Sequence, residues 1–352
     1  MQKYGHRPIV LLGGGTTLIG DPSGKDSTRK ILKQGEIKKN IQSIKKVFNK
    51  ILDTSNKKTT PIFVDNAEWL TKLNYIEFLR DIGSHFTINK MLTFDSVKLR
   101  LEREQSLSYM EFNYMILQAY DFLELNKKEN CSLQIGGSDQ WGNIVNGTEL
   151  IKRYSNKIAY GLTTPLITLA TGAKMGKTET GAVWLDKKLL SSYDYWQFWR
   201  NTDDRDVIKF LKMFTDLNVN EIVEIKNEDI NQLKIKLANE ATTMLHGKKD
   251  SEKAASTAKQ TFEQNLSGDG LPTYNISKNK INNKLTILEL ISSIKIEISK
   301  SEIRRLIKGK AIKINNKTVE DEKYLIKNET FSENNFLKLS IGKKKHIKIQ
   351  LN

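Results

Sequence analysis

The stretch Cys-Ser-Leu-Gln-Ile-Gly-Gly-Ser-Asp-Gln-Trp-Gly, residues 131–142, begins as a short apolar run and ends in a glycine-rich turn. The same order occurs near the N-terminus, where Pro-Ile-Val-Leu-Leu at 8–12 precedes three glycines at 13–15. Helical apolar spacing lies between the two runs, at 65–82, 95–104 and 109–125. Strand, glycine loop and helix in repeated succession predict a parallel sheet with helices on its faces. Ligands of such sheets bind at the carboxyl ends of the strands, where both glycine loops lie.

The second half of the chain changes character twice. Strand signals stop near residue 191 and helical spacing takes over, which predicts a small all-helical domain. The next segment is polar, rich in turn residues and without periodicity, as is typical of a linker. The expected segments are 1–190, 191–266, 267–284 (the linker) and 285–352. In the last of them we expect helices at 286–294 and 300–308, a hairpin at 311–319 and a half-buried strand at 346–351.

Composition limits the classes of protein to consider. The 352 residues include 57 Lys and Arg against 41 Asp and Glu, a formal net charge of +16, and no apolar run is long enough to span a membrane. We expect a globular protein without a membrane segment, and the single cysteine, Cys131, favours a reducing cytoplasm. Residues 276–352 hold 18 basic and 8 acidic residues. A lysine-rich genome explains part of this excess, but its concentration in one segment indicates contact with a polyanion.

Gly-Asp-Pro-Ser-Gly-Lys at 20–25 is a candidate phosphate-binding loop. It does not match a Walker A loop, because three residues rather than four separate its glycines and Asp26 follows the lysine. Asp21, Lys25 and Arg29 could together bind a zwitterion and a phosphate. The alternative is an ordinary glycine turn after a strand.

A second lysine-bearing loop, Gly-Ala-Lys-Met-Gly-Lys-Thr, occupies 172–178. It is one residue short of the Walker spacing, and no apolar strand leads directly into it. Lys174 and Lys177 beside a glycine make a flexible cationic clamp suited to the charge on transferring phosphates. The alternative is a solvated lysine loop.

Tyr114, Gln118 and Asp121 are spaced i, i+4, i+7 and so share one face of the helix expected at 109–125. Their neighbours are apolar, and a polar stripe in apolar surroundings must find hydrogen-bond partners. It either pairs within the protein or lines a pocket for a polar small molecule. In the later glycine loop, Asp139 offers a carboxylate to hydroxyls such as those of a ribose.

The histidines argue against several kinds of site. None of His6, His85, His246 and His346 has the spacing of a metal-ligand pair, and no Cys/His set or G-x-S-x-G elbow occurs. We therefore expect no metal site and no serine hydrolase chemistry. A lone histidine such as His85 is expected to be structural.

In combination, the loops at 20–25, 136–142 and 174–178 and the Tyr114, Gln118 and Asp121 stripe resemble the bacterial-type tyrosyl-tRNA synthetase family over the whole chain. The 174–178 segment resembles the family's KMSKS loop, and the C-terminal domain resembles an RNA-binding domain of a small-subunit ribosomal protein. The family implies an α/β Rossmann-like catalytic domain, a small all-α domain and a C-terminal α+β RNA-binding domain. It also implies activation of tyrosine by ATP and transfer to tRNA(Tyr), through positioning and charge stabilisation.

The resemblance assigns roles to residues at matching positions. Tyrosine would contact Asp21, Tyr114, Gln118 and Gln140, with Asp121 accepting its phenolic hydroxyl. ATP would contact Gly137, Asp139 and Lys177. Departing pyrophosphate would be stabilised by Lys25, Arg29, Lys174, Lys177 and Thr178. RNA would contact Arg304, Arg305, Lys308, Lys310, Lys343, Lys344 and Lys345.

The resemblance also implies partners. ATP would be a substrate accompanied by Mg²⁺, with no tightly bound cofactor and no metal cage of protein ligands. The chain would form a homodimer through the helices near residues 69–103, and would bind L-tyrosine and tRNA(Tyr) in the cytoplasm.

One feature departs from the family pattern. A His-x-Gly-His motif belongs before the loop at 13–15, together with a tyrosine and an aspartate of the substrate pocket, and the four histidines leave no place for it. We expect the N-terminal segment with the first strand of the sheet to be missing, and little or no adenylate synthesis by this chain. The alternative is a synthetase-derived RNA-binding protein without aminoacylation activity. A tryptophanyl enzyme is disfavoured by the polar stripe and by the C-terminal domain.

Overall fold

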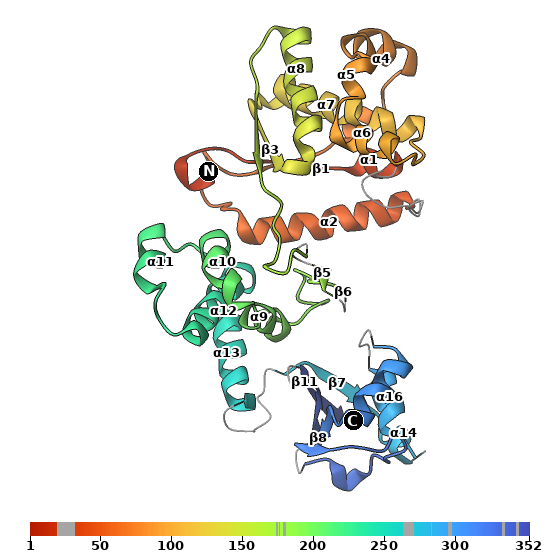
Figure 1. Cartoon of the computed structure of the whole chain (residues 1–352), viewed down its shortest axis with the longest axis vertical. Helices are drawn as coiled ribbons and strands as arrows, with labels where there is room; N and C mark the ends of the chain where they lie inside the picture. The colour runs from red at the N-terminus through yellow and green to blue at the C-terminus, as the bar shows by residue number, and fades with distance from the viewer. Residues whose placement is uncertain are drawn as a thin grey trace. The chain divides into compact units, whose positions relative to one another are not determined.

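The computed structural model (Figure 1) describes residues 1–19, 32–173, 175, 177–178, 181–262, 271–282, 284–294, 298–332, 335–342 and 345–352. The chain divides into two compact units, Met1–Ile167 and Thr168–Asn352. The first unit ends before the boundary expected near residue 190, because the following segment contacts the helices of the second unit. There the Ala170 N–H donates to Asp206 Oδ2 at 2.7 Å.

Short strands of the first unit form two parallel pairs. β1 (Ile9–Leu12) pairs with β2 (Ile62–Asp65), and β3 (Leu133–Gly137) pairs with β4 (Tyr160–Thr164). The parallel pairing expected from the apolar runs is confirmed. Among the described residues the two pairs are not hydrogen-bonded to each other. β2 and β4 are not predicted from the sequence, since neither ends in a glycine turn.

Helices account for most of the first unit. The described α-helices are α1 (Gly14–Ile19), α2 (Gln34–Ile51), α3 (Ala67–Leu70), α4 (Tyr75–Asp81), α5 (Ile88–Met91), α6 (Asp95–Glu102), α7 (Tyr109–Glu129) and α8 (Trp141–Ser155). The single helix expected at 65–82 is wrong, because Asn74 begins a new helix by accepting bonds from the N–H groups of Ile76 and Glu77. Short 3₁₀ turns occur at Gln2–Tyr4, Gly83–His85 and Ser138–Gln140. No helix in the described part of the chain is long and apolar enough to cross a membrane.

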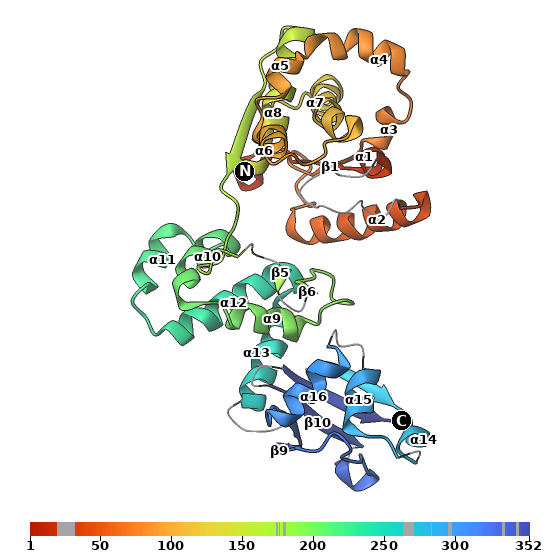
Figure 2. The same cartoon turned by 45° about the vertical axis from the view of Figure 1, so that its right-hand side comes forward.

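α7 is the central helix of this unit, and α8 lies alongside it (Figures 1 and 2). A capping box between Ser108 and Glu111 begins α7, and Asn130 ends it in the left-handed conformation with φ 52°. The two helices approach closely at Gly147 of α8, where a Cβ atom would lie 2.8 Å from Phe122 Cδ1. This close approach fixes the position of the α7 face that carries Asp121.

The structure confirms the all-helical region expected from the sequence, which lies in the second unit. After the two-stranded antiparallel pair β5 (Lys177–Thr178) and β6 (Gly181–Ala182) come α9 (Ser192–Arg200), α10 (Val207–Phe214), α11 (Val219–Ile225), α12 (Ile230–His246) and α13 (Lys248–Phe262), with a 3₁₀ turn at Asp204–Asp206. Aromatic contacts hold α9 on α10, with the Trp199 ring centroid 6.0 Å from that of Phe210 and 5.0 Å from that of Phe214.

A five-stranded sheet follows, in the order β7-β11-β10-β8-β9. Its strands are β7 (Thr273–Ile276), β8 (Ile312–Ile314), β9 (Lys317–Thr318), β10 (Phe336–Ile341) and β11 (Lys345–Leu351), and its helices are α14 (Lys278–Asn282), α15 (Ile287–Ser293) and α16 (Lys300–Lys308), with a 3₁₀ turn at Asn328–Thr330. The predicted helices, hairpin and final strand are confirmed. The linker expected at 267–284 is corrected, because β7 and α14 lie inside it and β7 pairs in parallel with β11.

Replacing Gly147 by alanine should lower the free energy of unfolding by about 1–3 kcal/mol, because the added methyl group overlaps the Phe122 ring. Gly35 near the start of α2 is the matched control, since no atom lies within 4 Å of a Cβ built there. Gly35→Ala should leave stability unchanged or raise it by up to about 1 kcal/mol. Urea unfolding of both variants measures the difference, and equal effects would contradict the close helix approach.

Candidate active site

The carboxyl ends of β1 and β2 are joined by hydrogen bonds to the start of α1. The Gly14 N–H donates to Asp65 Oδ1 at 3.1 Å, and the Gly15 N–H donates to Asn66 Oδ1 at 2.8 Å. A Cβ atom at position 14 would lie 2.2 Å from Asp65 Oδ1, so any larger residue there would displace the Asp65 carboxylate from the start of α1. The first amides of α1 are thus occupied by side chains of this chain, and Asn66 is held in one orientation.

Asn66 also reaches across to α7, where it meets the buried side chain of Asp121. Asn66 Nδ2 donates to Asp121 Oδ2 at 2.9 Å, and Trp69 Nε1 donates to Asp121 Oδ1 at 2.7 Å. Asp121 is 3% exposed. Burial raises the pKa of this carboxyl to about 6, the two donated hydrogen bonds oppose the rise, and nearby Glu124 adds to it. Internal pairing, one of the two alternatives for the polar stripe, therefore holds for Asp121.

The other two members of the stripe, Tyr114 and Gln118, lie on α7 as the spacing predicts. Gln118 Oε1 is buried and has no hydrogen-bond partner among the described residues. A buried amide oxygen without a donor is costly unless a ligand or a water supplies one. Gln118 therefore offers a preformed acceptor to a donor such as an ammonium group.

The glycine loop after β3 presents a second set of predicted residues. Asp139 lies in an exposed 3₁₀ turn, and Gln140 donates from Nε2 to Asp139 Oδ2 at 3.4 Å. A Cβ atom on Gly137 would lie 2.6 Å from Asp139 Oδ1, so a larger residue there would displace the Asp139 carboxylate. Gln140 Oε1 accepts a bond from Asn143 Nδ2 at 3.1 Å, which orients its amide. α8 begins immediately after the turn and packs on α7, so one helix connects this loop to the polar stripe.

The remaining catalytic predictions fall where the structure gives little detail. Lys174 and the predicted residues of the earlier loop, Asp21, Lys25 and Arg29, lie outside the described residues. Lys177 and Thr178 form β5, and only their backbone is described. Their roles stay predictions. Among the described residues no group of three or more His, Cys, Asp and Glu side chains could hold a metal ion.

Three of the basic residues predicted to contact RNA form ion pairs at the surface of the C-terminal domain. Arg304 Nε lies 2.8 Å from Glu322 Oε2, and Lys310 Nζ lies 3.0 Å from Glu320 Oε1. Arg305 pairs with Glu302 at 2.7 Å, while Lys308 is exposed. Lys345 faces Asp194 of α9 closely enough to influence the pKa of that carboxyl. Lys343 and Lys344 lie outside the described residues.

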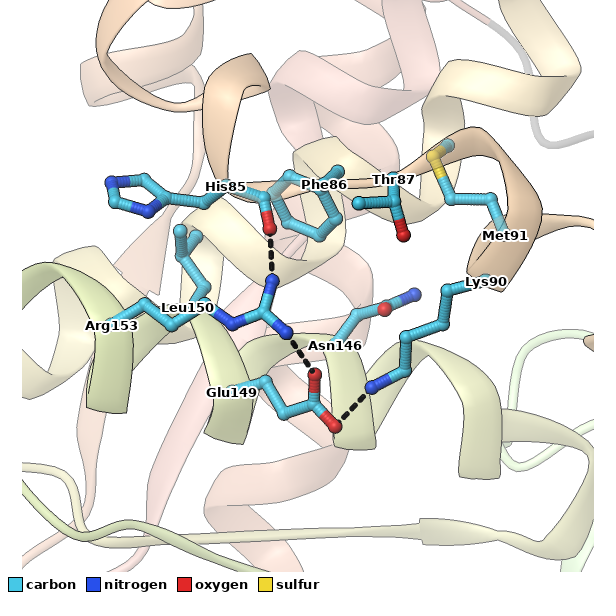
Figure 3. A pocket seen from close by; sticks show the side chains of 9 residues that line it. All are labelled: His85, Phe86, Thr87, Lys90, Met91, Asn146, Glu149, Leu150 and Arg153. Carbon is cyan, nitrogen blue, oxygen red and sulfur yellow. Dashed lines mark hydrogen bonds and ion pairs between the residues drawn. The ribbon is translucent and has the colours of Figure 1, made fainter.

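A small cavity lies elsewhere in the first unit, between α5 and α8 (Figure 3). Its volume, about 10 Å³, suits a single water molecule. Glu149 bridges Lys90 and Arg153 on its floor, and Arg153 also donates to the His85 carbonyl oxygen. None of the predicted site residues lines it. His85 interacts here through its backbone and packs its ring on Tyr154, consistent with a structural role.

Two protein families match this chain over nearly its whole length. Residues 1–263 match the family "tRNA synthetases class I (W and Y)", and residues 261–349 match the "Tyrosine–tRNA ligase SYY-like C-terminal domain". The chain belongs to the class I tRNA synthetases of the tryptophan and tyrosine type. The resemblance expected from the motifs and the α/β fold class are thereby confirmed.

Several relatives of this synthetase are similar over nearly its whole length. The tyrosine–tRNA ligase of Pelagibacter ubique (strain HTCC1062) is 69% identical over 351 residues, covering 100% of this chain and 86% of the relative. That of Wolbachia sp. subsp. Brugia malayi (strain TRS) is 52% identical, covering 100% and 85%. The C-terminally truncated mitochondrial tyrosyl-tRNA synthetase of Aspergillus nidulans is 31% identical with a TM-score of 0.61, covering 74% of this chain and 78% of that structure.

Sequence reasoning misses two residues of the candidate site, Asn66 and Trp69. They supply both described donors to Asp121 from more than 50 positions away in the chain. The only local signal is an asparagine directly after a strand, where the ligand edge of a parallel sheet is expected. Trp69 falls at the start of the segment assigned to the dimer interface, but it is 4% exposed and packs inside this chain.

The pKa of Asp121 predicts how stability depends on pH. The folded protein holds this proton more tightly than the unfolded chain, so the stability it contributes is complete below about pH 4 and is lost as the pH rises through 6. Relative to Asp121→Asn, the free energy of unfolding of the unmodified chain should fall by about 3 kcal/mol between pH 4 and pH 8. Urea unfolding of both proteins across this range measures the change. A difference that does not vary with pH would contradict the raised pKa.

Proposed function

We propose that this chain is a tyrosine–tRNA ligase, which activates L-tyrosine with ATP to tyrosyl-adenylate and transfers the tyrosyl group to tRNA(Tyr). The observation that carries the proposal is the buried Asp121 carboxylate, held by Asn66 and Trp69 on the same helical face as Tyr114 and Gln118. The family match over 1–263 and the 69% identity to a tyrosine–tRNA ligase support it. The comparisons give no support to an RNA-binding protein without this activity.

Asp121 is the acceptor for the phenolic hydroxyl in this proposal. An ionised carboxylate has about four lone-pair positions, and Asn66 and Trp69 use one on each oxygen. The free positions can accept the tyrosine O–H. Phenylalanine has no hydroxyl, so in the same place it would leave the buried carboxylate with an unused acceptor site. The free-energy cost of that unused site is the basis for rejecting phenylalanine.

Neighbouring residues bind the tyrosine ammonium and carboxylate and the ATP ribose. Gln118 Oε1, buried and without a described partner, accepts from the tyrosine ammonium together with Tyr114 and Asp21. Gln140 lies near the substrate carboxylate and the α-phosphate. Gly137 allows close approach of the ribose, whose hydroxyls donate to the exposed Asp139 carboxylate.

The cationic loops act on the departing pyrophosphate. Lys174, Lys177 and Thr178, with Lys25 and Arg29, stabilise the negative charge that develops as pyrophosphate leaves. Mg²⁺ enters with the ATP phosphates, which hold it together with water rather than through a cage of protein ligands. No covalent enzyme intermediate is needed, because the tyrosine carboxylate itself attacks the α-phosphate.

A homodimer and a cytoplasmic location complete the proposal. Large apolar side chains lie exposed along α4 to α7, among them Ile76 at 70%, Ile88 at 64% and Tyr109 at 63% exposure. Tyr75 and Tyr109 bring α4 and α7 together through hydroxyls 2.8 Å apart, and exposed apolar side chains gathered on neighbouring helices are typical of a face that pairs with another protein. We place the subunit contact there, and leave buried Trp69 out of it.

Tyrosine-dependent exchange of labelled pyrophosphate into ATP tests the activity directly. Because its sequence contains no His-x-Gly-His motif, the unmodified chain should catalyse the exchange only weakly, with tyrosine and not with phenylalanine. Asp121→Ala should reduce the preference for tyrosine over phenylalanine by about tenfold or more, because the acceptor for the hydroxyl is gone. No tyrosine-dependent exchange by the unmodified chain would overturn the proposal. Undiminished discrimination by the variant would overturn the role of Asp121 alone.

Binding to tRNA(Tyr) tests the charged C-terminal surface. Lys308→Glu should weaken binding and reduce the slope of log affinity against log salt by about one. Lys226→Glu makes the same charge change at an exposed position after α11 and is the control. Filter binding at several salt concentrations measures both slopes, and equal losses for the two variants would argue against a specific RNA surface on the C-terminal domain.

A further inference from the structure

A second acidic residue lies on the face of α7 that carries Asp121. Asp121, Glu124 and Lys128 are spaced i, i+3, i+7, which places them in one row along the helix. Glu124 is 7% exposed, nearly as buried as Asp121. The proposed binding of tyrosine does not use it. A buried acid normally requires a partner, so its contacts show what it does.

Glu124 is held by two lysines that differ in what else they contact. Glu124 Oε2 lies 3.1 Å from Lys128 Nζ, and Oε1 lies 3.5 Å from Lys127 Nζ. Lys128 Nζ also lies 4.8 Å from the centroid of the Trp69 ring. Lys127 Nζ instead lies 4.1 Å from the centroid of the Tyr154 ring. Of these two lysines, only Lys128 therefore connects Glu124 to Trp69, one of the two described donors to Asp121.

Trp69 lies between Lys128 and Asp121. One face of its ring receives the Lys128 ammonium, and its Nε1–H donates to Asp121 Oδ1 at 2.7 Å. A cation over an indole is attracted by the electron density of the ring, and it draws density from the N–H group. It therefore both fixes the ring and strengthens the N–H as a donor in the buried hydrogen-bond chain.

Glu124 has the opposite effect on Asp121 to that of Lys128, because its negative charge disfavours the ionised carboxylate. Two carboxylates on one face of a buried helix repel, and Glu124 contributes to the raised pKa of Asp121. The other described groups around Asp121 are Tyr120 on α7, Asn66 directly after β2 and Trp69 on α3, and Asp65 is next to Asn66 in the chain. Asp65 is bound to the N–H groups of Gly14 and Ala67. The lysines on Glu124 are therefore the cations that offset its charge.

We propose that the Glu124–Lys128 ion pair is a positioning device for tyrosine recognition, in which Lys128 holds the Trp69 indole so that its N–H meets the Asp121 carboxylate. Lys128 and Glu124 do not touch the substrate, so they are positioning residues. The inference rests on the proposed function for its role in tyrosine binding, while the contacts themselves belong to the free protein.

The test uses the Trp69 indole N–H as a probe in the full-length chain. Tryptophan labelled with ¹⁵N at the indole gives five N–H signals, one for each tryptophan, and Trp69→Phe identifies the signal of interest. Its chemical shift is followed from pH 4.5 to 8.5, where it reports titration of Asp121. The variants are Lys128→Met, Lys128→Arg, Lys127→Met and Glu124→Gln. Lys128 is half-exposed, so its replacement by methionine preserves most of its packing.

Lys128→Met should raise the titration midpoint by about 0.5 pH unit and move the indole proton signal to higher field, because both the cation and its strengthening of the N–H are lost. Lys128→Arg should restore both. Lys127→Met removes a positive charge that pairs with Glu124 but does not lie against Trp69. It should therefore leave the indole proton signal at its original field at high pH. Glu124→Gln should lower the midpoint. A Lys128→Met spectrum and midpoint equal to those of the unmodified chain would overturn the inference.

Pyrophosphate exchange then tests whether the Glu124–Lys128 ion pair affects tyrosine binding during the reaction. In Lys128→Met, the rise in KM for tyrosine at low pH should begin at a higher pH, by the same shift as the indole titration, while kcat at pH 8 stays close to that of the unmodified chain. Absence of exchange in the unmodified chain overturns the proposed function and leaves the spectroscopic result standing. Normal exchange with an unmoved pH profile in Lys128→Met overturns the role in tyrosine recognition.

Discussion

The bond from Asn66 to Asp121 joins the two parts of the candidate site. Asn66 binds the start of α1 through its oxygen and Asp121 through its nitrogen, so one amide ties the edge of the β1–β2 pair to α7. If that amide were rotated, it would oppose a donor to the N–H of Gly15 and an acceptor to the carboxylate. Only one orientation of the Asn66 amide satisfies both hydrogen bonds. Asn66 therefore fixes the stripe on α7 relative to the strand ends.

Local patterns predict the elements whose signals lie within a few residues. α7 follows from its apolar spacing and its capping box at Ser108, and the hairpin follows from Asn315 and Asn316, which both adopt positive φ. β7 is missed because its four residues form a strand by pairing with β11, whose partner residues lie 75 positions later in the chain. The break before α4 is missed because apolar spacing continues across Asn74, and only the capping bonds reveal it.

The same limit applies to the site. The spacing of Tyr114, Gln118 and Asp121 predicts a shared face, since a helix converts sequence distance directly into geometry. Nothing comparable links Asp121 to Asn66 or Trp69, which come from another element. Charge counts have a similar limit, because the net charge of the C-terminal domain does not show that Arg304, Arg305 and Lys310 each have an acidic neighbour. Those exposed pairs are weak, so phosphates can replace the acids.

The chemistry around Asp121 explains why an aspartate fits there in spite of its burial. Asn66 Nδ2 and Trp69 Nε1 are both donors, and the tyrosine hydroxyl would be a third. An asparagine would offer one oxygen and one donating amide, so one of the two protein donors would face another donor. An ionised carboxylate accepts on both oxygens and has positions to spare. Burial raises the pKa of this carboxyl, and the converging donors oppose the rise by stabilising its charged form. The residues that steady Trp69 and neutralise Glu124 act in the same direction as the donors.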